Sequence, residues 1–384
     1  MVTPSPAPPT NPGAPCTSYA NQKKSMKRKE TISASPRKGG NSVIAVMLLA
    51  IAIVADSAVA SDIKTVDVDG GGRTSALLVK ADEATRPSGI PEDISGIAMG
   101  KDGSFWAVCD SRRELCRLVV DIDLDKGKIK KCSLSEIRHV SGGKDMEGIA
   151  YDPLRDSLWI CDEKGPRIFE YAFNERKTGE EISLPENLRK CMKNRSLEAL
   201  EISPDGLVLL TCNENAIPGD TIPGMANSVP VRMTKFTRKN AADPWKFHSQ
   251  RYYLPEPPRG NVRNSKCRNG VASVCVDSQG RIFVLERESD KTDGAHFRIR
   301  VFEILSPIEA DSGSSGLMPV LKKRLVYEED TGMSMYEGMC LGPLLKNGLQ
   351  TFVLVSDGDS KASESIMTLV FVKPGFAKPQ RASR

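Results

Sequence analysis

A two-strand pattern returns five times along this chain, and it restricts the possible folds more than any other feature. Each copy has a strand of small and apolar residues, a polar turn, and a second strand that ends in an acidic or amide residue. Turn formers such as Lys101-Asp102-Gly103 and Asp152-Pro153 reverse the chain between the strands. The first strands cover residues 95–99, 147–151, 198–202, 272–276 and 337–341, and the second strands 105–110, 158–162, 208–213, 282–286 and 352–357.

Further strands follow in each copy, so that the units read as four-stranded meanders. The first two copies start 52 residues apart and the next pair 51, and polar insertions near 214–230, 255–269 and 306–320 lengthen the later units. A four-stranded meander repeated in this way is typical of a propeller blade. We therefore predict an all-β propeller of five antiparallel blades, with a sixth blade from residues 61–92 left open. A β-sandwich is the alternative fold, but it does not explain the repetition.

The ends of the domain predict how the ring closes. The fifth unit lacks a clear fourth strand, and Ser75 to Lys80 forms a strand-like segment that precedes the first unit. Pairing of Ser75 to Lys80 with Ile366 to Val372 would remove two exposed sheet edges. We expect this N-terminal strand to complete the last blade.

The first sixty residues have a different composition from the rest. Residues 1–42 are rich in Pro, Ser, Lys and Asn and are predicted to be disordered. An apolar run of 13 residues from Val43 to Ala55 and the sequence Ala58-Val59-Ala60 then predict a signal peptide over 43–60, cleaved after Ala60. A membrane anchor is the alternative, but a span needs about 20 apolar residues. We expect a secreted or periplasmic propeller over residues 61–384, without a stable membrane span.

Composition narrows the function classes. The chain has 384 residues, of which 39% are hydrophobic and 27% charged, so it can bury a large core. Its formal charge of +5 comes from basic residues that precede the apolar run, and they lie outside the predicted propeller. Nothing predicts a nucleic-acid footprint, which needs clustered basic residues on the folded domain. We expect a monomer that binds a small molecule.

The cysteines do not form a recognisable metal motif. There are ten, of which Cys16 would be lost with the signal peptide. Cys109, Cys161 and Cys212 fall at one position of three repeats, which favours small buried side chains. Cys109 and Cys116 flank a tight turn and could face each other across a hairpin. The chain has no CxxC pair and only three His, which disfavours a zinc site.

Acidic residues recur at equivalent positions of the repeats. The first strand of each propeller blade lines the central channel, so Glu147, Glu198 and Glu337 should converge there. The second strands end in Asp110, Asp162, Asn213, Glu286 and Asp357, and Arg287 follows Glu286. Each acid taken singly could be a solvated surface residue. Together they repel one another unless a cation such as Ca²⁺ neutralises them, or unless one carboxyl stays protonated as an acid/base pair.

Several of these segments resemble the esterase-like phytase family. The likeness runs in order over about residues 90–372, essentially the whole predicted propeller. It is carried by the segments 145–152, 194–200, 284–287, 336–339 and 355–357. The resemblance implies a propeller rich in Glu and Asp that hydrolyses phosphoesters. Ala199 and Gly358-Asp359 depart from the family pattern.

From these residues we predict a metal-assisted phosphoester hydrolase that acts on a small anionic ester. Candidate catalytic residues are Glu147, Glu198, Glu286 and Arg287, the last pairing with a substrate phosphate. Candidate ligands of Ca²⁺ are Glu147, Glu198, Glu337, Asp357 and Asp162.

Two other functions stay open. Trp159-Ile160-Cys161-Asp162 is loosely similar to the gluconolactonase propellers, which would make the chain a calcium-dependent lactonase-like hydrolase. The third possibility is a non-catalytic exported propeller that binds a partner through its loops. The insertion 255–269 carries Arg259, Arg263, Lys266 and Arg268, which could recruit an anionic ligand or simply be solvated.

Overall fold

The structure, a computed structural model, divides into two units, Met1–Ile53 and Val54–Arg384. All residues that it describes belong to the second unit: 77–85, 93–110, 112–173, 177–191, 194–222, 229–259, 266–292, 296–309, 318–357 and 365–372. The predicted disordered segment 1–42, the predicted signal peptide 43–60 and the Gly358-Asp359 pair lie outside these residues. Within the described ranges, no helix is long and apolar enough to cross a membrane.

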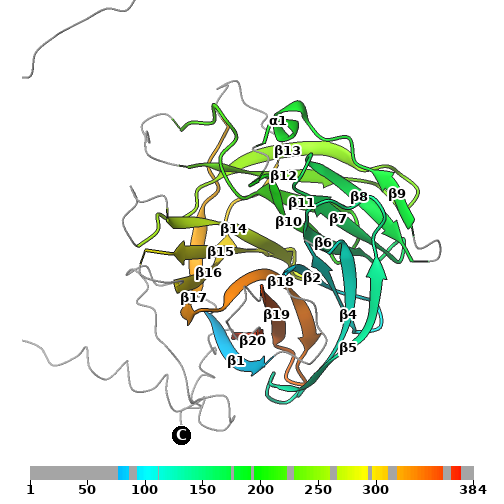
Figure 1. Cartoon of the computed structure of the whole chain (residues 1–384), viewed down its shortest axis with the longest axis vertical. Coiled ribbons are helices and arrows are strands. Elements are labelled where there is room, and N and C mark those ends of the chain that lie inside the picture. Colours follow the sequence, from blue (N-terminus) through cyan, green and yellow to red (C-terminus); the bar gives the residue numbers. More distant parts are fainter. Residues whose placement is uncertain are drawn as a thin grey trace, which may run out of the picture. The chain divides into compact units, whose positions relative to one another are not determined.

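Five four-stranded antiparallel sheets form a β-propeller, as predicted, and Figure 1 shows them around a common centre. The first blade contains β2 (Ile94–Met99), β3 (Phe105–Cys109), β4 (Glu114–Ile122) and β5 (Ile129–His139). The second contains β6 (Met146–Asp152), β7 (Ser157–Asp162), β8 (Arg167–Ala172) and β9 (Lys177–Glu181). The third contains β10 (Leu197–Ile202), β11 (Val208–Asn213), β12 (Val231–Thr237) and β13 (Lys246–Tyr253). The fourth contains β14 (Cys267–Val276), β15 (Ile282–Asp290), β16 (His296–Ile304) and β17 (Lys323–Gly332). The one helix within the described residues is α1 (Glu186–Arg189).

The fifth blade confirms the predicted closure. It contains β18 (Met335–Leu344), β19 (Gln350–Asp357) and β20 (Ser365–Val372), and β1 (Leu77–Thr85) is its outer strand. The pairing of β1 with β20 runs antiparallel from Leu77 opposite Val372 to Thr85 opposite Ser365. The N-terminal segment therefore completes the fifth blade and does not build a sixth.

The core lies between neighbouring blades. Strands β3 and β7 are buried at every position, because adjacent blades cover both faces of these strands. Large aromatic side chains fill the spaces between blades, such as Phe283 of the fourth blade, whose ring centroid lies 5.1 Å from that of Phe352 in the fifth. The inner strands β2, β6, β10, β14 and β18 contact one another around the ring. This packing holds the channel walls at fixed positions.

A bulge recurs at the same position of every inner strand. The pairing register shifts between Ile94 and Gly96, Met146 and Ile149, Leu197 and Ala199, Val271 and Ser273, and Tyr336 and Gly338. The residues left out of the ladder include Ser95, Glu147, Glu198, Ala272 and Glu337, which are the repeated positions found in the sequence. A bulge reorients the side chain that it carries. These residues therefore point in a different direction from their neighbours on the regular strand faces.

Candidate functional site

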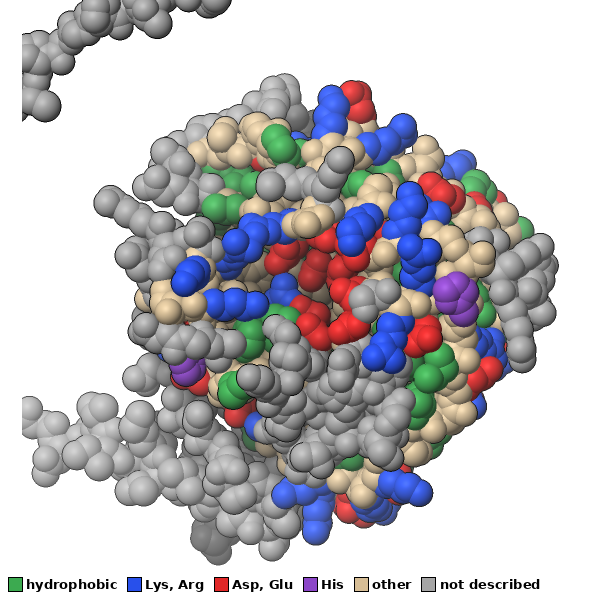
Figure 2. Space-filling view, viewed as in Figure 1, with side chains coloured by type: hydrophobic (Ala, Val, Ile, Leu, Met, Phe, Trp, Pro, Cys, Tyr) green, Lys and Arg blue, Asp and Glu red, His purple; other side chains and the backbone are tan. Residues whose placement is uncertain are grey.

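Acidic side chains gather in a hollow on one face of the propeller, and lysines and arginines surround it (Figure 2). Within the described residues, the carboxylates that could share an ion form two groups. One consists of Asp110, Asp145 and Glu147, and the other of Glu163, Glu198 and Glu214.

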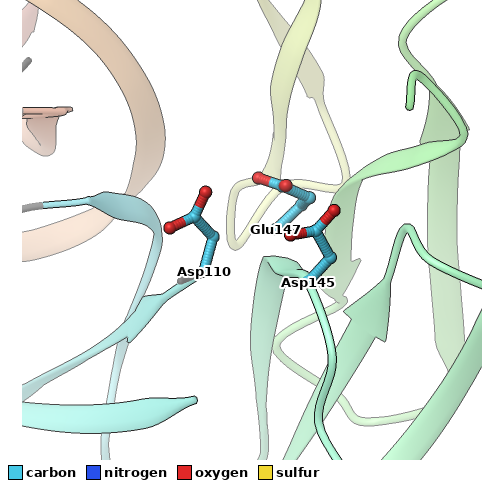
Figure 3. A group of neighbouring side chains, drawn as sticks. All are labelled: Asp110, Asp145 and Glu147. Atoms are coloured by element: carbon cyan, nitrogen blue, oxygen red, sulfur yellow. The ribbon is translucent and has the colours of Figure 1, made fainter. Parts of the chain in front are cut away.

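The first group joins the first two blades. Asp110 directly follows β3, Asp145 precedes β6, and Glu147 occupies the β6 bulge. One oxygen from each carboxylate lies within 4.8 Å of the others, and Figure 3 shows the three side chains around a shared space. Asp145 also pairs with Lys164 at 3.0 Å, but that lysine side chain is 55% exposed. The group is therefore acidic, with an exposed and readily displaced ammonium beside it.

The second group joins the second and third blades. The Glu163 carboxylate accepts a hydrogen bond from the backbone N–H of Ser196 at 3.0 Å, and the Ser196 hydroxyl donates to the Glu163 carbonyl at 2.9 Å. The backbone N–H of Glu214 donates to the carbonyl of Ser196 at 2.9 Å. Ser196 thus fixes Glu163 and Glu214 beside Glu198, the bulged residue of β10.

Arg287 supplies a positive charge to the second group. Its Nη2 lies 3.0 Å from a Glu214 carboxylate oxygen and 3.7 Å from one of Glu198, and its Nη1 pairs with Glu337. Burial alone would lower the pKa of Arg287, but the charges of Glu214, Glu198 and Glu147 outweigh it and raise the pKa. The guanidinium thereby bridges carboxylates from the third and fifth blades, so it acts as a counter-ion that belongs to the protein.

Burial and mutual repulsion shift the carboxyl groups toward their neutral forms. The pKa of Glu147 rises to about 8, through burial first and then the charges of Asp110, Glu163 and Asp145. Burial raises the pKa of Glu163 to about 7 despite the Ser196 hydrogen bond, and the pKa of Glu198 is also raised by burial and by Glu147. At neutral pH these groups can therefore hold protons, or release them to a bound cation.

The other predicted ligands have structural partners. The carboxylate of Asp162 is fully buried, accepts from the backbone N–H of Lys144 at 2.9 Å and of Asp145 at 3.0 Å, and pairs with Arg167 at 3.1 Å. It orients the turn that presents Asp145. Asp357 ends β19 opposite Met335 and belongs to neither carboxylate group.

Glu286, predicted to be catalytic, is also fully buried. Its carboxylate accepts from the Tyr253 hydroxyl at 2.6 Å and the Asn269 side-chain amide at 2.6 Å, and pairs with Lys323 at 2.7 Å. These bonds hold it between the third and fourth blades. The structure brings the predicted Glu198, Glu337 and Arg287 together, places Glu147 in the neighbouring group, and leaves Glu286, Asp162 and Asp357 outside both.

Sequence reasoning missed Glu163 and Glu214 as site residues and named Asp110 only as a strand end. Glu163, Glu214 and Arg287 each follow the acidic or amide residue that ends the second-strand motif of their blade. Successive side chains of a strand point to opposite faces, so the preceding Asp162, Asn213 and Glu286 are buried within the sheets. A comparison of the repeats at the position that follows these acidic or amide residues would have found Glu163 and Glu214.

The donor chemistry distinguishes the two groups as cation sites. Ca²⁺ prefers several oxygen ligands, mostly carboxylates. The first group offers three carboxylates that converge, so its residues fit such an ion. The second group already pairs with Arg287, whose positive charge would repel a metal. The residues therefore fit Ca²⁺ at Asp110, Asp145 and Glu147, and do not fit it at Glu198 and Glu337.

A cavity of about 750 Å³ adjoins the second group. Glu214 and Arg287 line it, and the insertion 255–269 contributes apolar and polar residues to its wall. Four further cationic side chains line the same cavity: Arg195, Lys266, Arg268 and Lys291. Arg259 pairs instead with Glu328 at 2.5 Å, and Arg263 lies outside the described residues. The cavity thus places positive charge beside the channel carboxylates.

Comparisons with known proteins give one family match. A family model described as "Phytase-like: Esterase-like activity of phytase" matches residues 92–360. No curated protein matches the chain.

Solved structures that resemble the chain include a PQQ-bound aldose sugar dehydrogenase from Streptomyces coelicolor, with 12% identity, 78% of this chain and 99% of that chain covered, and a TM-score of 0.41. A putative gluconolactonase has 16% identity, 72% and 74% coverage and a TM-score of 0.35. A virginiamycin B lyase from Staphylococcus aureus has 8% identity, 78% and 100% coverage and a TM-score of 0.34.

Proposed function

Because this chain belongs to the phytase-like family, we propose that it is a metal-assisted hydrolase of small anionic phosphoesters. The observation that carries the proposal is the cavity in which cationic side chains adjoin the channel carboxylates. A phosphoester needs positive charge to bind its phosphate, and carboxylates to hold a cation or move a proton. The cavity and the two carboxylate groups provide both within one channel.

The cationic side chains at the cavity are the candidates for binding phosphate. Arg195, Lys266, Arg268 and Lys291 all line the cavity. Arg287 was predicted for this role, but its guanidinium is paired with Glu214, Glu198 and Glu337. We therefore assign Arg287 the role of positioning these carboxylates. We assign phosphate binding to the cavity wall because four cationic side chains line it together.

In the proposed hydrolase, Ca²⁺ would be held by Asp110, Asp145 and Glu147. When bound, the ion would supply positive charge for an ester oxygen and would lower the pKa of a water molecule. Binding of the ion to Asp145 would break the ion pair between that carboxylate and Lys164. Glu163, whose pKa is raised to about 7, would exchange a proton at neutral pH, which is the requirement for a general acid or base.

Hydrolysis assays of the purified protein test this proposal. We expect turnover of phosphomonoesters or phosphodiesters with Ca²⁺, and none with chelator. Replacing Lys266 or Arg268 by Gln should raise KM about tenfold, since a charge-assisted hydrogen bond contributes roughly 1.5–3 kcal/mol. The matched control Arg259→Gln lies on the same insertion but outside the cavity, and should leave KM unchanged.

Other outcomes of the same assays would contradict the proposal. Turnover of lactones alone would favour a lactonase-like hydrolase, and no turnover of any ester would favour a non-catalytic binding propeller.

We also propose export through the signal peptide over 43–60, so that the protein would meet an extracellular ester. Millimolar Ca²⁺ outside the cell would occupy even a calcium site of weak affinity.

A further inference from the structure

Two buried cysteine side chains lie against each other in the first blade. Cys109 ends β3 and Cys116 lies in β4, and their Sγ atoms are 3.5 Å apart. Both residues are completely shielded from solvent. The two sulfurs are therefore in direct contact across a single hairpin.

Strand pairing shows why the two side chains meet. Ala107 lies opposite Cys116, and Cys109 lies opposite Glu114, so the cysteines are diagonal neighbours on one face of the hairpin. A disulfide bond has an S–S length of about 2.05 Å. The sulfurs, now 3.5 Å apart, would have to approach by roughly 1.5 Å to form the bond.

The second and third blades lack this pair although they share one of its members. Cys161 and Cys212 occupy the repeat position of Cys109. The positions equivalent to Cys116 hold Glu170, opposite Trp159, and Lys235, opposite Leu210. Cys161 instead accepts a hydrogen bond from the backbone N–H of Gly148 at 3.1 Å. The second cysteine is thus specific to the first blade, where β3 leads directly into Asp110.

We propose that Cys109 and Cys116 form a disulfide that closes the β3–β4 hairpin when the protein folds in an oxidising environment. The oxidant is a low-molecular-weight disulfide such as oxidised glutathione. The thiolate of one cysteine attacks it, releases one thiol and forms a mixed disulfide. The second cysteine then displaces the second thiol, so the pair loses two electrons and two protons, and the oxidant is reduced to two thiols. This inference does not rest on the proposed hydrolase activity.

Burial determines when the reaction occurs. Both thiols are completely buried in the folded blade, so an oxidant in solution cannot reach either of them there. The bond therefore forms before the first blade packs against its neighbours. Once formed, it resists reductants for the same reason, and it restrains the chain immediately before Asp110.

Refolding of the full chain tests the proposal. The reduced, unfolded protein is refolded in a mixture of oxidised and reduced glutathione, denatured again, and labelled with a thiol-alkylating reagent. We expect the cysteines at 109 and 116 to escape labelling. Trypsin cleaves at Arg112 and Arg113 between them, so the disulfide should hold two peptides together until reductant is added. Labelling of both cysteines in the refolded protein would overturn the proposal.

Two variants and a melting experiment complete the test. Cys116→Ala should leave Cys109 open to labelling, whereas the matched Cys275→Ala, buried in the fourth blade, should keep the linked peptides. The oxidised wild type should melt roughly 5 °C above the fully reduced protein, as expected for closure of a short loop. Linkage of Cys109 to any cysteine other than Cys116 would contradict the pairing.

Discussion

Replacing Arg287 by Gln is expected to reduce the free energy of unfolding by about 3–5 kcal/mol, because it leaves buried carboxylates without their counter-ion. The Arg287 side chain is 14% exposed and pairs with Glu198, Glu214 and Glu337. Glutamine cannot neutralise these groups, so the carboxylates would repel one another or take up protons. The loss should be smaller at acidic pH, because burial and the charge of Glu147 raise the pKa of Glu198 and favour its neutral form. Denaturant unfolding at pH 5 and pH 8 measures both effects.

A surface pair provides the control for Arg287. Arg259 pairs with Glu328, but its side chain is 56% exposed. Exposed ion pairs contribute about 0–1 kcal/mol, so Arg259→Gln should cost at most that. Equal effects of the two substitutions, or a fully stable Arg287→Gln protein, would show that Arg287 is not the counter-ion of the channel.

The second large effect is expected for Gly148→Ala. A Cβ atom at this position would lie 2.7 Å from the carbonyl oxygen of Glu198, 2.8 Å from Sγ of Cys161 and 2.9 Å from the backbone nitrogen of Leu200. Two of these atoms belong to the backbone of the neighbouring blade, so no rotamer change relieves the overlap. We expect a loss of about 3 kcal/mol in unfolding free energy, and displacement of the adjacent Glu147 from its carboxylate group.

Ala199 offers the matched control, because it occupies the same repeat position in the third blade. There the fold accommodates a Cβ, and the residue is buried. Ala199→Gly should cost only about 1 kcal/mol, the usual entropic penalty of glycine in a strand. If Gly148→Ala unfolds at the same denaturant concentration as the wild type, the inner strands do not approach as closely as the structure shows.

The repeat in the sequence was sufficient to predict the propeller, its five blades and the strand that closes it. Strand periodicity is a local property of the sequence. The closing strand pairs segments from opposite ends of the domain, but the general need to pair exposed sheet edges was enough to predict it. The same repeat identified Glu147, Glu198 and Glu337, because equivalent positions of equivalent blades lie near one axis. The bulges explain why these positions are special, but a bulge leaves no clear mark in a single sequence.

The ligand set could not be predicted in the same way. Which of two adjacent residues at a strand end faces the channel depends on the local register, and a shift by one residue separates Glu286 from Arg287 and Asp162 from Glu163. The pairing of Arg287 with glutamates from other blades is a long-range contact that spacing cannot reveal. The cationic wall of the cavity also arises from distant segments, since Arg195 and Lys291 join Lys266 and Arg268 only in the folded ring.

The melting temperature of the protein with Ca²⁺ and with chelator tests most directly whether the first carboxylate group holds a cation. An ion that binds only the folded form stabilises it by about 2.7 kcal/mol at a hundredfold excess over its dissociation constant. Glu147→Gln and Asp110→Asn should weaken the response. Glu201→Gln should preserve it, since Glu201 lies on β10 outside both carboxylate groups.

The pH dependence of this measurement follows from Glu147. Because its pKa in the fold is raised from 4.5 to about 8, its contribution to the stability of the metal-free fold is present below about pH 4.5 and is lost as the pH rises through 8. A bound cation must displace that proton, so the gain from Ca²⁺ should be larger at pH 9 than at pH 6. We predict that Ca²⁺ raises the melting temperature and that this rise is larger at pH 9 than at pH 6. A wild type that melts identically with Ca²⁺ and with chelator at both pH values, and that carries no metal on elemental analysis, would contradict the calcium site.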